Sequence, residues 1–410
     1  MVVRRYAIVG LGSRAQLFAR ALAGSPRAEL AAFCDRSETR MRVHNGWLGA
    51  SVPGYRPADF PAMLAKERVD VVVVCTPDHT HADYVVAALH AGCDVVTEKP
   101  MTTGVDGARR ILAARRETGH SVRVAFNYRY NPVHRRVREL LAAGAIGEIG
   151  SVEFSWLLDT AHGADYFRRW HREKANSGGL LVHKSGHHFD LVNWWLGRGP
   201  ETVFAFGRLF FYGDGNGHRR TAADDRFALD LEASPKLRAL YRDAEREDGY
   251  VRNQDVFAPG VTIEDDLSVL VRHRGGVVLN YHLHAYSPRE GYRVAFAGSE
   301  GRLELDVREN EFPAGAVPAP EPGRARLTVQ RHWAPSEVVL DEVLGEGHGG
   351  GDERMLAELL GDAEPDELGC AADHDSGLQA LLTGLAADRS LATGAPVPVD
   401  ELLAEIGEPA

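Results

Sequence analysis

The sequence predicts an α/β protein with an N-terminal doubly wound parallel sheet and a C-terminal α+β domain built on a large, mostly antiparallel open sheet. Three observations lead to this prediction. Short apolar, β-branched runs alternate with helical patterns over the first 125 residues, which is typical of parallel strands covered on both faces. Longer runs of alternating polar and apolar residues dominate the remainder, as expected of antiparallel strands. A glycine-rich turn follows the first run directly. We therefore expect domains at 1–125 and 126–410.

The apolar periodicity places the N-terminal elements. Strands are predicted at Tyr6–Val9, Leu30–Cys34, Val69–Cys75, Asp94–Thr97 and Val122–Phe126. Helical patterns lie between them, at Gln16–Leu22, Ala58–Lys66, His81–His90 and Gly107–Glu117. The regular alternation of strand and helix makes a parallel sheet the expected arrangement.

The C-terminal elements follow a helix that ends near Ala143. Strands are predicted at Ser151–Trp156, Thr202–Leu209, Leu267–Arg272, Val277–His284, Tyr292–Ala297, Arg302–Leu305 and Arg326–His332. One helix is expected over Leu180–Leu196, and two more near Met355–Leu360 and Leu378–Leu391. The polar stretch Phe211–Ala233 and the Pro-, Gly- and Ala-rich stretch Phe312–Arg324 are predicted loops.

The composition limits which kinds of partner and which cellular compartment we expect for this chain. The chain has 410 residues and a formal charge of 47 − 58 = −11. An acidic surface argues against nucleic acid or an anionic membrane as the main partner. Four scattered cysteines form no disulfide framework or metal knuckle, and no apolar run is long enough to span a membrane. The N-terminus lacks the features of a signal peptide. We expect a cytoplasmic, enzyme-like chain without a metal.

The first strand runs into Gly10-Leu11-Gly12-Ser13-Arg14-Ala15, a G-x-G-x-x-G/A pattern between a strand and a helix. Gly10 permits the tight turn, Gly12 lets a pyrophosphate approach the backbone, and Ala15 allows close packing of helix on strand. Asp35 follows at the end of the second strand and is placed to bind the ribose hydroxyls. These features predict a Rossmann-type dinucleotide site. Asp35 favours NAD, whereas the adjacent Arg36 leaves NADP open.

Two further strand ends should face the same crevice, because ligands bind at the carboxyl ends of parallel strands. The third strand is followed by Thr76-Pro77-Asp78-His79-Thr80-His81. Thr76 and Pro77 should lie near the cofactor, while the two histidines are candidates for exposed positions at the start of a helix. The fourth strand ends in Glu98-Lys99-Pro100, where the Lys-Pro bond can be cis. Lys99, one of only five lysines, could hydrogen-bond a substrate hydroxyl.

The order of motifs carries a family resemblance. The glycine turn, the C-T-P-D-H-T-H turn at Cys75–His81, E-K-P at Glu98–Pro100 and F-N-Y-R-Y-N-P at Phe126–Pro132 together resemble the Gfo/Idh/MocA family of glucose-fructose oxidoreductases and inositol dehydrogenases. The resemblance continues through Gly178–Leu181, the histidine helix after it, and Gly301–Glu304. It therefore covers most of the chain in order.

The helix at Leu180–Leu196 carries the chemistry that this resemblance implies. His187 matches the family's catalytic histidine, and histidine suits proton transfer near neutral pH. Family members usually carry aspartate where this chain has His183, and again at Asp190. The substitution at His183, with Lys184 and His188 beside it, leaves open which group is the base. A buried histidine cluster and a zinc pair through H-x-x-x-H are the alternatives, although no third ligand is evident.

Weaker candidates flank this helix. Tyr128 and Arg129 lie at the predicted domain junction, where they could touch cofactor or substrate. The aromatic and cationic loop Tyr166–His171 suits sugar binding, with a surface loop as the alternative.

The resemblance implies a reversible oxidation of a secondary alcohol on a sugar, sugar derivative or cyclitol, with hydride passing to NAD(P). It also implies a homodimer or homotetramer. A glycosidase that oxidises its sugar transiently with bound NAD, and a non-catalytic NAD sensor, are the two other classes considered. Expected catalytic residues are Lys99, His187, His183 and Lys184. Expected cofactor contacts are Gly10, Gly12, Ser13, Arg14, Ala15, Asp35, Arg36, Thr76, Pro77, His79, Glu98, Lys99, Asn127 and Arg129. Expected substrate contacts are Lys99, Tyr128, Arg168, Trp170, His183, His187 and His188.

Overall fold

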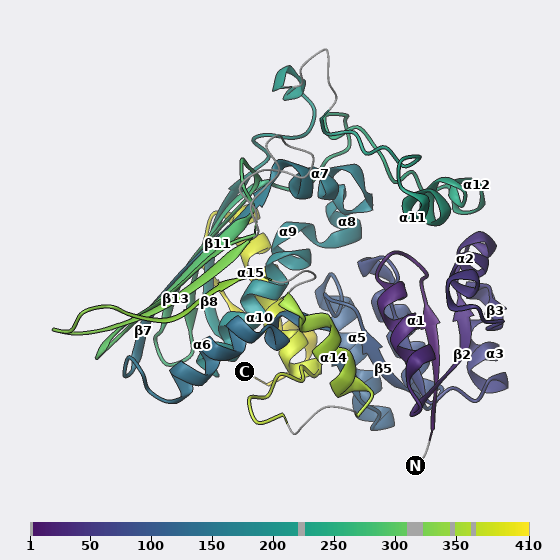
Figure 1. Ribbon diagram of the computed structural model, residues 1–410, viewed down its shortest axis with the longest axis horizontal. Helices are drawn as coiled ribbons and strands as arrows, with labels where there is room; N and C mark the ends of the chain where they lie inside the picture. Colours follow the sequence, from purple (N-terminus) through teal and green to yellow (C-terminus); the bar gives the residue numbers. More distant parts are fainter. Residues whose placement is uncertain (1–2, 220–225, 310–322, 345–348, 362–365, 410) are drawn as a thin grey trace. The chain divides into compact units, whose positions relative to one another are not determined.

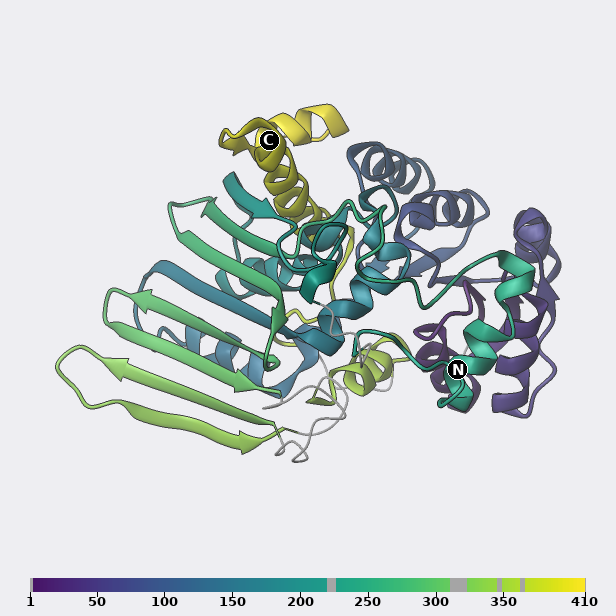
Figure 2. The same cartoon turned by 90° about the horizontal axis from the view of Figure 1, so that it is seen from above.

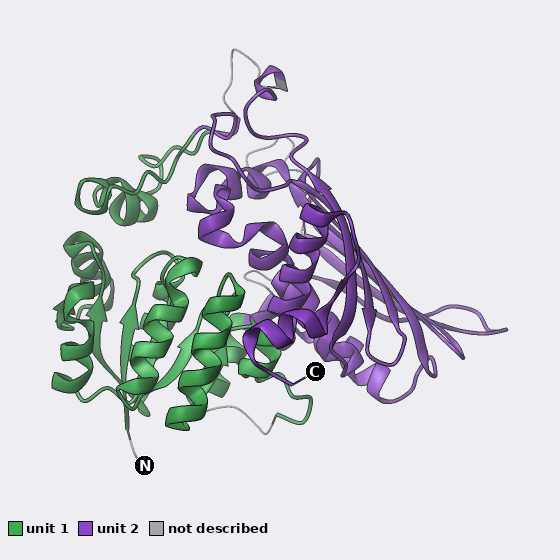
Figure 3. Ribbon diagram, turned by 180° about the vertical axis from the view of Figure 1, so that it is seen from behind, with its two compact units in different colours: residues 1–126, 228–254, 352–378 green, residues 127–227, 255–351, 379–410 purple. Residues whose placement is uncertain are grey.

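The computed structural model describes residues 3–219, 226–309, 323–344, 349–361 and 366–409. They form two compact units (Figure 3). The first contains 1–126, 228–254 and 352–378, and the second contains 127–227, 255–351 and 379–410. The sequence predicts one boundary near residue 125. The structure also groups two later segments with the N-terminal unit.

The N-terminal unit is a Rossmann-like parallel sheet with helices, as the sequence predicts. Its strand order is β3-β2-β1-β4-β5-β6, the order in which a dinucleotide crevice forms where the winding reverses. The strands are β1 (Arg4–Val9), β2 (Ala28–Cys34), β3 (Gly54–Tyr55), β4 (Val71–Val74), β5 (Asp94–Thr97) and β6 (Val122–Val124). The helices are α1 (Ala15–Gly24), α2 (Glu38–Leu48), α3 (Phe60–Lys66), α4 (His81–His90) and α5 (Val105–Thr118).

Apolar periodicity missed α2 and β3. Helix α2 buries only Arg40, Met41 and His44, so it shows no apolar stripe. Its ends are nevertheless well specified: the Ser37 side chain accepts a hydrogen bond from the Arg40 amide, and Gly49 ends the helix in the left-handed conformation. Strand β3 has two residues and is too short to produce a pattern.

The second unit contains a nine-stranded sheet in the order β14-β13-β12-β11-β7-β10-β9-β8-β15. All neighbouring pairs are antiparallel except β7 and β10, which confirms the predicted mostly antiparallel sheet. Its strands are β7 (Ile149–Asp159), β8 (Pro200–Arg208), β9 (Asp266–His273), β10 (Val278–Ser287), β11 (Gly291–Gly298), β12 (Gly301–Arg308), β13 (Arg324–Arg331), β14 (Glu337–Val343) and β15 (Val397–Pro398). Strand β14, which the sequence analysis missed, is mostly exposed and lacks a buried alternation.

Helices of this unit lie beside one face of the sheet (Figures 1 and 2). They include α6 (Pro132–Ala142), α7 (Thr160–Arg168), α8 (Lys174–Ser177), α9 (Gly179–His183), α10 (Ser185–Leu196) and α16 (Val399–Ile406). Helices α14 (Gly351–Leu359) and α15 (His374–Thr393) contain residues of both units. None of the described helices is long and apolar enough to cross a bilayer.

Two sequence predictions need adjustment. The single helix expected over Leu180–Leu196 is two helices, α9 and α10, which meet at Lys184. The predicted loop at Phe312–Arg324 falls almost entirely outside the described residues, although Arg324 begins β13. The break at Lys184 affects the site, because it sets this side chain between the two histidine-bearing helices.

Candidate active site

The glycine turn has the geometry that a dinucleotide phosphate requires. Gly10 has a φ of +84°, and a Cβ there would lie 2.6 Å from the Thr76 amide nitrogen. A side chain is therefore excluded from the turn. A Cβ on Gly12 would meet only the Tyr241 hydroxyl, at 3.7 Å. The backbone at Gly12 can thus be approached closely, as a pyrophosphate must do.

Asp35 is buried at the end of β2 and is held by the turn itself. One carboxylate oxygen accepts a hydrogen bond from the Leu11 amide at 2.6 Å, and the other accepts from the Ser37 amide at 2.8 Å. A carboxylate offers about four acceptor positions, so these two bonds orient Asp35 and leave capacity for ribose hydroxyls. The turn and the acid together fit NAD.

The predicted cofactor residues Arg14 and Glu98 form an ion pair within this unit. Arg14 Nε lies 2.7 Å from Glu98 Oε1, and its terminal nitrogens lie 3.2–3.3 Å from the carboxylate of Asp352. Burial opposes the charged form, but the two carboxylates prevail and raise the pKa of Arg14. Glu98 also accepts from the Lys99 amide at 3.2 Å. This network joins the glycine turn to the loop that carries Lys99.

A cavity of about 550 Å³ opens beside the turn. Its lining includes Ser13 and three cationic side chains, those of Arg14, Arg20 and Lys236. Burial and the neighbouring Arg20 lower the pKa of Lys236. Because Arg14 is already paired with Glu98 and Asp352, Arg20 and Lys236 are the groups that give this cavity its positive charge.

His81 organises the two strand-end loops, a role that the sequence analysis missed. It was expected to be exposed at the start of α4, yet it is fully buried. Its Nδ1 lies 2.8 Å from the Pro100 carbonyl, and its Nε2 lies 2.9 Å from the Thr76 carbonyl. Burial lowers the pKa of His81, against these two bonds. His81 therefore ties the loop after β4 to the loop that contains Lys99.

The remaining predicted residues of these loops are accessible to differing degrees. Thr76, Pro77 and Lys99 are half-buried, and His79 and Arg36 are exposed. The Lys99–Pro100 peptide bond is cis, one of the two isomers allowed by the sequence. Thr80 donates a hydrogen bond from its hydroxyl to Thr76 Oγ1 at 2.8 Å, which fixes the start of the helix after β4.

In the second unit, the helix junction brings together Lys184, Tyr128 and His187. The Lys184 ammonium donates a hydrogen bond to the Tyr128 hydroxyl at 3.2 Å and lies 4.7 Å from the centre of the Trp156 ring. The Tyr128 ring stacks on the His187 imidazole, with centroids 4.3 Å apart. Burial lowers the pKa of Lys184 and raises that of Tyr128. Three of the predicted site residues thus form one contiguous group.

His183 lies in a second group, with the aromatic residues of the preceding loop. Its ring meets His171 edge to face at 4.3 Å and Tyr166 at 5.7 Å. His171 in turn stacks on the half-buried Trp170 at 3.6 Å. The structure therefore brings the predicted sugar-binding loop against the histidine helix.

Other predicted residues have interior contacts. His188 is fully buried, stacks on Trp156 at 4.0 Å and shares a 2.7 Å hydrogen bond with the Tyr281 hydroxyl. Arg168 is buried and donates hydrogen bonds to the carbonyls of Phe227 and Ala161. These contacts hold α10 and α7 in place within the unit.

Arg129 and Asp190 form a buried two-pronged ion pair. Arg129 Nε lies 2.8 Å from Asp190 Oδ2, and its Nη2 lies 2.6 Å from Oδ1. Asn127 begins the same short 3₁₀ turn (Asn127–Tyr130) and is also buried. The pair joins this turn to α10, and so places Tyr128 relative to His187.

His134 completes the support of Tyr128 and was not identified from the sequence. Its Nδ1 donates to the Tyr128 carbonyl at 2.8 Å, and its Nε2 accepts from the Tyr292 hydroxyl at 2.6 Å. Burial lowers the pKa of His134 to about 4. The ring is neutral at pH 7, as this donor and acceptor pattern requires.

Within the described ranges, one group has the proximity of a metal site. Asp373, His374 and Asp375 offer ligand atoms within 4.8 Å of one another. Asp373 accepts a hydrogen bond from the Ser376 amide in the first turn of α15, and His374 pairs with Asp375. Helix capping accounts for this group.

Comparisons with known proteins agree with this architecture. A family model described as the NAD-binding Rossmann fold of the GFO_IDH_MocA oxidoreductase family matches residues 4–126, and the model of its C-terminal alpha/beta domain matches 138–399. The Bacillus subtilis protein named "Putative oxidoreductase YteT" is 37% identical over 377 residues, which cover 86% of each chain.

Two further comparisons are shorter or more distant. Inositol 2-dehydrogenase of Rhizobium meliloti is 31% identical over 201 residues, which cover 49% of this chain and 57% of that enzyme. The structure of the WlbA dehydrogenase of Bordetella pertussis, solved with NADH and UDP-GlcNAcA, has a TM-score of 0.66 and 21% identity, with 97% of this chain and 98% of that chain covered. With an NAD-binding Rossmann unit and a matching C-terminal domain, the chain belongs to the Gfo/Idh/MocA family of oxidoreductases.

Proposed function

We propose that this protein reversibly oxidises a secondary alcohol of a sugar, sugar derivative or cyclitol. Bound NAD would supply the hydride acceptor, held at its phosphates by the Gly10–Ala15 turn and at its ribose by Asp35. The substrate class is supported by the similarity to inositol 2-dehydrogenase and by the aromatic rings around His183. Aromatic faces and hydrogen-bond donors are the groups that bind polyhydroxylated ligands.

The Lys184–Tyr128–His187 arrangement is the observation that carries this proposal. An alcohol must lose its hydroxyl proton as hydride leaves carbon, so the protein must supply a base near neutral pH. By the resemblance, His187 matches the family's catalytic histidine, and histidine is a side chain whose ordinary pKa suits this task. Its stacking on Tyr128 fixes the plane of the imidazole. We assign proton transfer to His187.

Lys184 serves as a positioning residue in this proposal. Its ammonium is buried against Trp156 and donates to the Tyr128 hydroxyl, so it acts on His187 through the stacked phenol ring. Lys99, at the half-buried end of β5, is proposed to polarise the substrate hydroxyl. His183 and Trp170 are proposed to bind the rest of the substrate.

The test measures whether a panel of cyclitols and sugars reduces NAD, with the absorbance of NADH as the readout. We expect turnover with at least one polyol. His187→Gln should lower kcat/KM by about 10²- to 10⁴-fold, the usual contribution of a general base. His282→Gln is the matched control, because His282 lies on β10 of the same unit with a side chain 40% exposed.

The other two functional classes give different results in this assay. A glycosidase with transient oxidation would release a hydrolysed sugar without net NADH. A sensor would bind NAD without turnover of any kind. Full activity in His187→Gln would refute the assignment of the base.

A further inference from the structure

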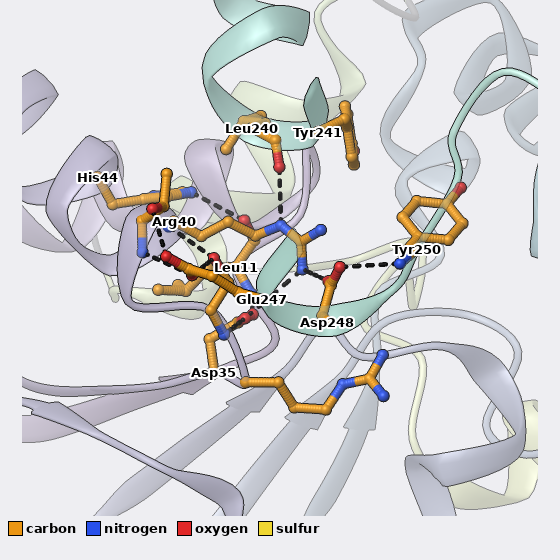
Figure 4. Close-up of polar contacts among 12 residues, drawn as sticks. Leu11, Asp35, Arg40, His44, Leu240, Tyr241, Glu247, Asp248 and Tyr250 are labelled. Atoms are coloured by element: carbon orange, nitrogen blue, oxygen red, sulfur yellow. Dashed lines mark hydrogen bonds and ion pairs between the residues drawn. The ribbon is translucent and has the colours of Figure 1, made fainter. Parts of the chain in front are cut away.

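Residues 228–254 lie against the nucleotide-binding face of the first unit (Figure 4). They include α11 (Pro235–Leu237), a turn of π-helix (Arg238–Arg242) and α12 (Glu245–Asp248). The Tyr241 hydroxyl accepts a hydrogen bond from the Ser13 amide at 3.1 Å, and the Leu240 carbonyl accepts one from Arg40 Nε at 2.8 Å. The segment therefore reaches both the glycine turn and helix α2.

Glu247 of this segment occupies the start of helix α2. Its Oε2 accepts from the Ser37 hydroxyl at 2.5 Å and from the Thr39 amide at 3.0 Å, and its Oε1 accepts from the Thr39 hydroxyl at 2.6 Å. These bonds lower the pKa of Glu247 to about 2, and the bond from Ser37 has the largest effect. A carboxylate thus occupies the donors that begin this eleven-residue helix.

Asp248 neutralises the cation next to this position. Its Oδ2 lies 2.5 Å from Arg40 Nη1, which in turn lies 3.6 Å from Asp35 Oδ1. Both side chains of the Arg40–Asp248 pair are at most 9% exposed. The Arg40 guanidinium therefore faces two carboxylates, those of Asp35 and Asp248. A third carboxylate, that of Glu247, lies at the start of helix α2.

These are the groups that a 2′-phosphate would need. NADP differs from NAD by a phosphate on the adenosine ribose, beside the acid that ends β2. A phosphate at this point binds to helix amides, hydroxyl donors and a nearby arginine. In this structure, Glu247 takes the amide and hydroxyl donors, and Asp248 takes the arginine. Any phosphate brought there would meet fixed negative charge.

We propose that residues 228–254 form a selectivity element, in which Glu247 and Asp248 fill the 2′-phosphate position and restrict the protein to NAD. The inference rests on the nucleotide site of the proposed function, but not on the alcohol that is oxidised.

The experiment measures dissociation constants of NAD⁺ and NADP⁺ by titration calorimetry, without substrate. The test variants are Glu247→Gln and the double variant Glu247→Gln/Asp248→Asn. The matched control is Glu245→Gln/Asp243→Asn, which removes the same charge from the same segment. Glu245 pairs with Arg242, and Asp243 with Arg238, so neither holds Ser37, Thr39 or Arg40 in the contacts described above. Thermal melting checks that each variant is folded.

The wild type should prefer NAD⁺. Glu247→Gln should improve the affinity for NADP⁺ relative to NAD⁺ by about threefold to tenfold, and the double variant by about tenfold or more, as expected for removal of nearby like charge. The preference of the wild type should weaken in high salt, because these charges are partly screened. The control should keep the wild-type ratio.

Three outcomes would overturn the inference: a wild type that prefers NADP⁺, test variants with an unchanged ratio, or a control that shifts the ratio as much as the test variants. Failure of the proposed reaction looks different. In that case the nucleotide ratios change as expected, while no polyol reduces NAD.

Discussion

The imidazole of His187 lies parallel to the phenol ring of Tyr128, with ring centroids 4.3 Å apart and planes inclined by 13°. Both rings are buried, and Tyr128 is held in turn by Lys184 at its hydroxyl and by His134 at its carbonyl. The proposed base is therefore oriented by a residue near the start of the second unit.

Replacement of Lys184 or Tyr128 should affect the same step. Lys184→Met and Tyr128→Phe each remove one half of the 3.2 Å hydrogen bond, so each should lower kcat and change its pH profile. Because the two residues act as a unit, the double variant should lose less than the sum of the single losses. The measurement is a double-mutant cycle on kcat across pH. Strict additivity, with an unchanged pH profile, would contradict the positioning role.

Lys99→Met should separate catalysis from cofactor binding. Lys99 is half-buried at the end of β5, and its replacement removes the proposed polarising cation while the glycine turn and Asp35 remain. We expect turnover to fall by at least about 10²-fold, with the dissociation constant of NAD within about threefold of wild type. Steady-state kinetics and calorimetry measure the two effects. A fully active variant would show that Lys99 has no catalytic part.

Asp190→Asn should destabilise the protein. The substitution leaves the Arg129 guanidinium buried without its carboxylate, and the loss of one partner of a buried pair costs about 3–5 kcal/mol. Denaturant unfolding measures the change in free energy. Arg136, which forms an exposed pair with Glu139 on α6, supplies the comparison: Glu139→Gln should change stability by less than about 1 kcal/mol.

Stability should fall as the pH drops from about 6.5 towards 4, in part through His134. Burial lowers the pKa of this side chain from 6.5 to about 4 in the folded state. Between these values the unfolded chain takes up a proton that the folded chain does not, so the stabilisation present above pH 6.5 is lost as the pH falls. His134→Gln should remove up to about 1.4 kcal/mol of this loss per pH unit. Denaturant unfolding of the wild type and of His134→Gln at pH 7, 6 and 5 gives the slope of the unfolding free energy against pH for each protein. The two slopes would be equal if His134 did not titrate in this way.

The open face of the nine-stranded sheet should be covered by a second copy of the chain. Phe206 on β8 and Leu270 on β9 are 66% and 49% exposed, and exposed apolar groups on one sheet face mark an interface. We expect a homodimer or homotetramer in light scattering. The double variant Phe206→Glu/Leu270→Glu should shift the oligomer towards monomer. A wild-type protein that is a monomer would refute the prediction.

The sequence by itself determined the local parts of this protein. The glycine turn, Asp35, the E-K-P loop and the two sheet classes all follow from short motifs and from periodicity, because they depend on residues close together in the chain. Helix α2 and strand β14 were missed for the converse reason, since their few buried side chains leave no pattern.

Only the tertiary structure decided which distant residues meet. Lys184 and Tyr128 are 56 positions apart, and Arg129 and Asp190 are 61 apart. Glu247 reaches Ser37 across 210 positions, from a stretch in which the sequence showed no motif. Contacts of this range depend on how whole strands and helices pack. Lys184, Arg129 and Asp190 are ordinary side chains until packing buries them, whereas Glu247 stays exposed and gains its partners only because the chain brings it to the start of α2.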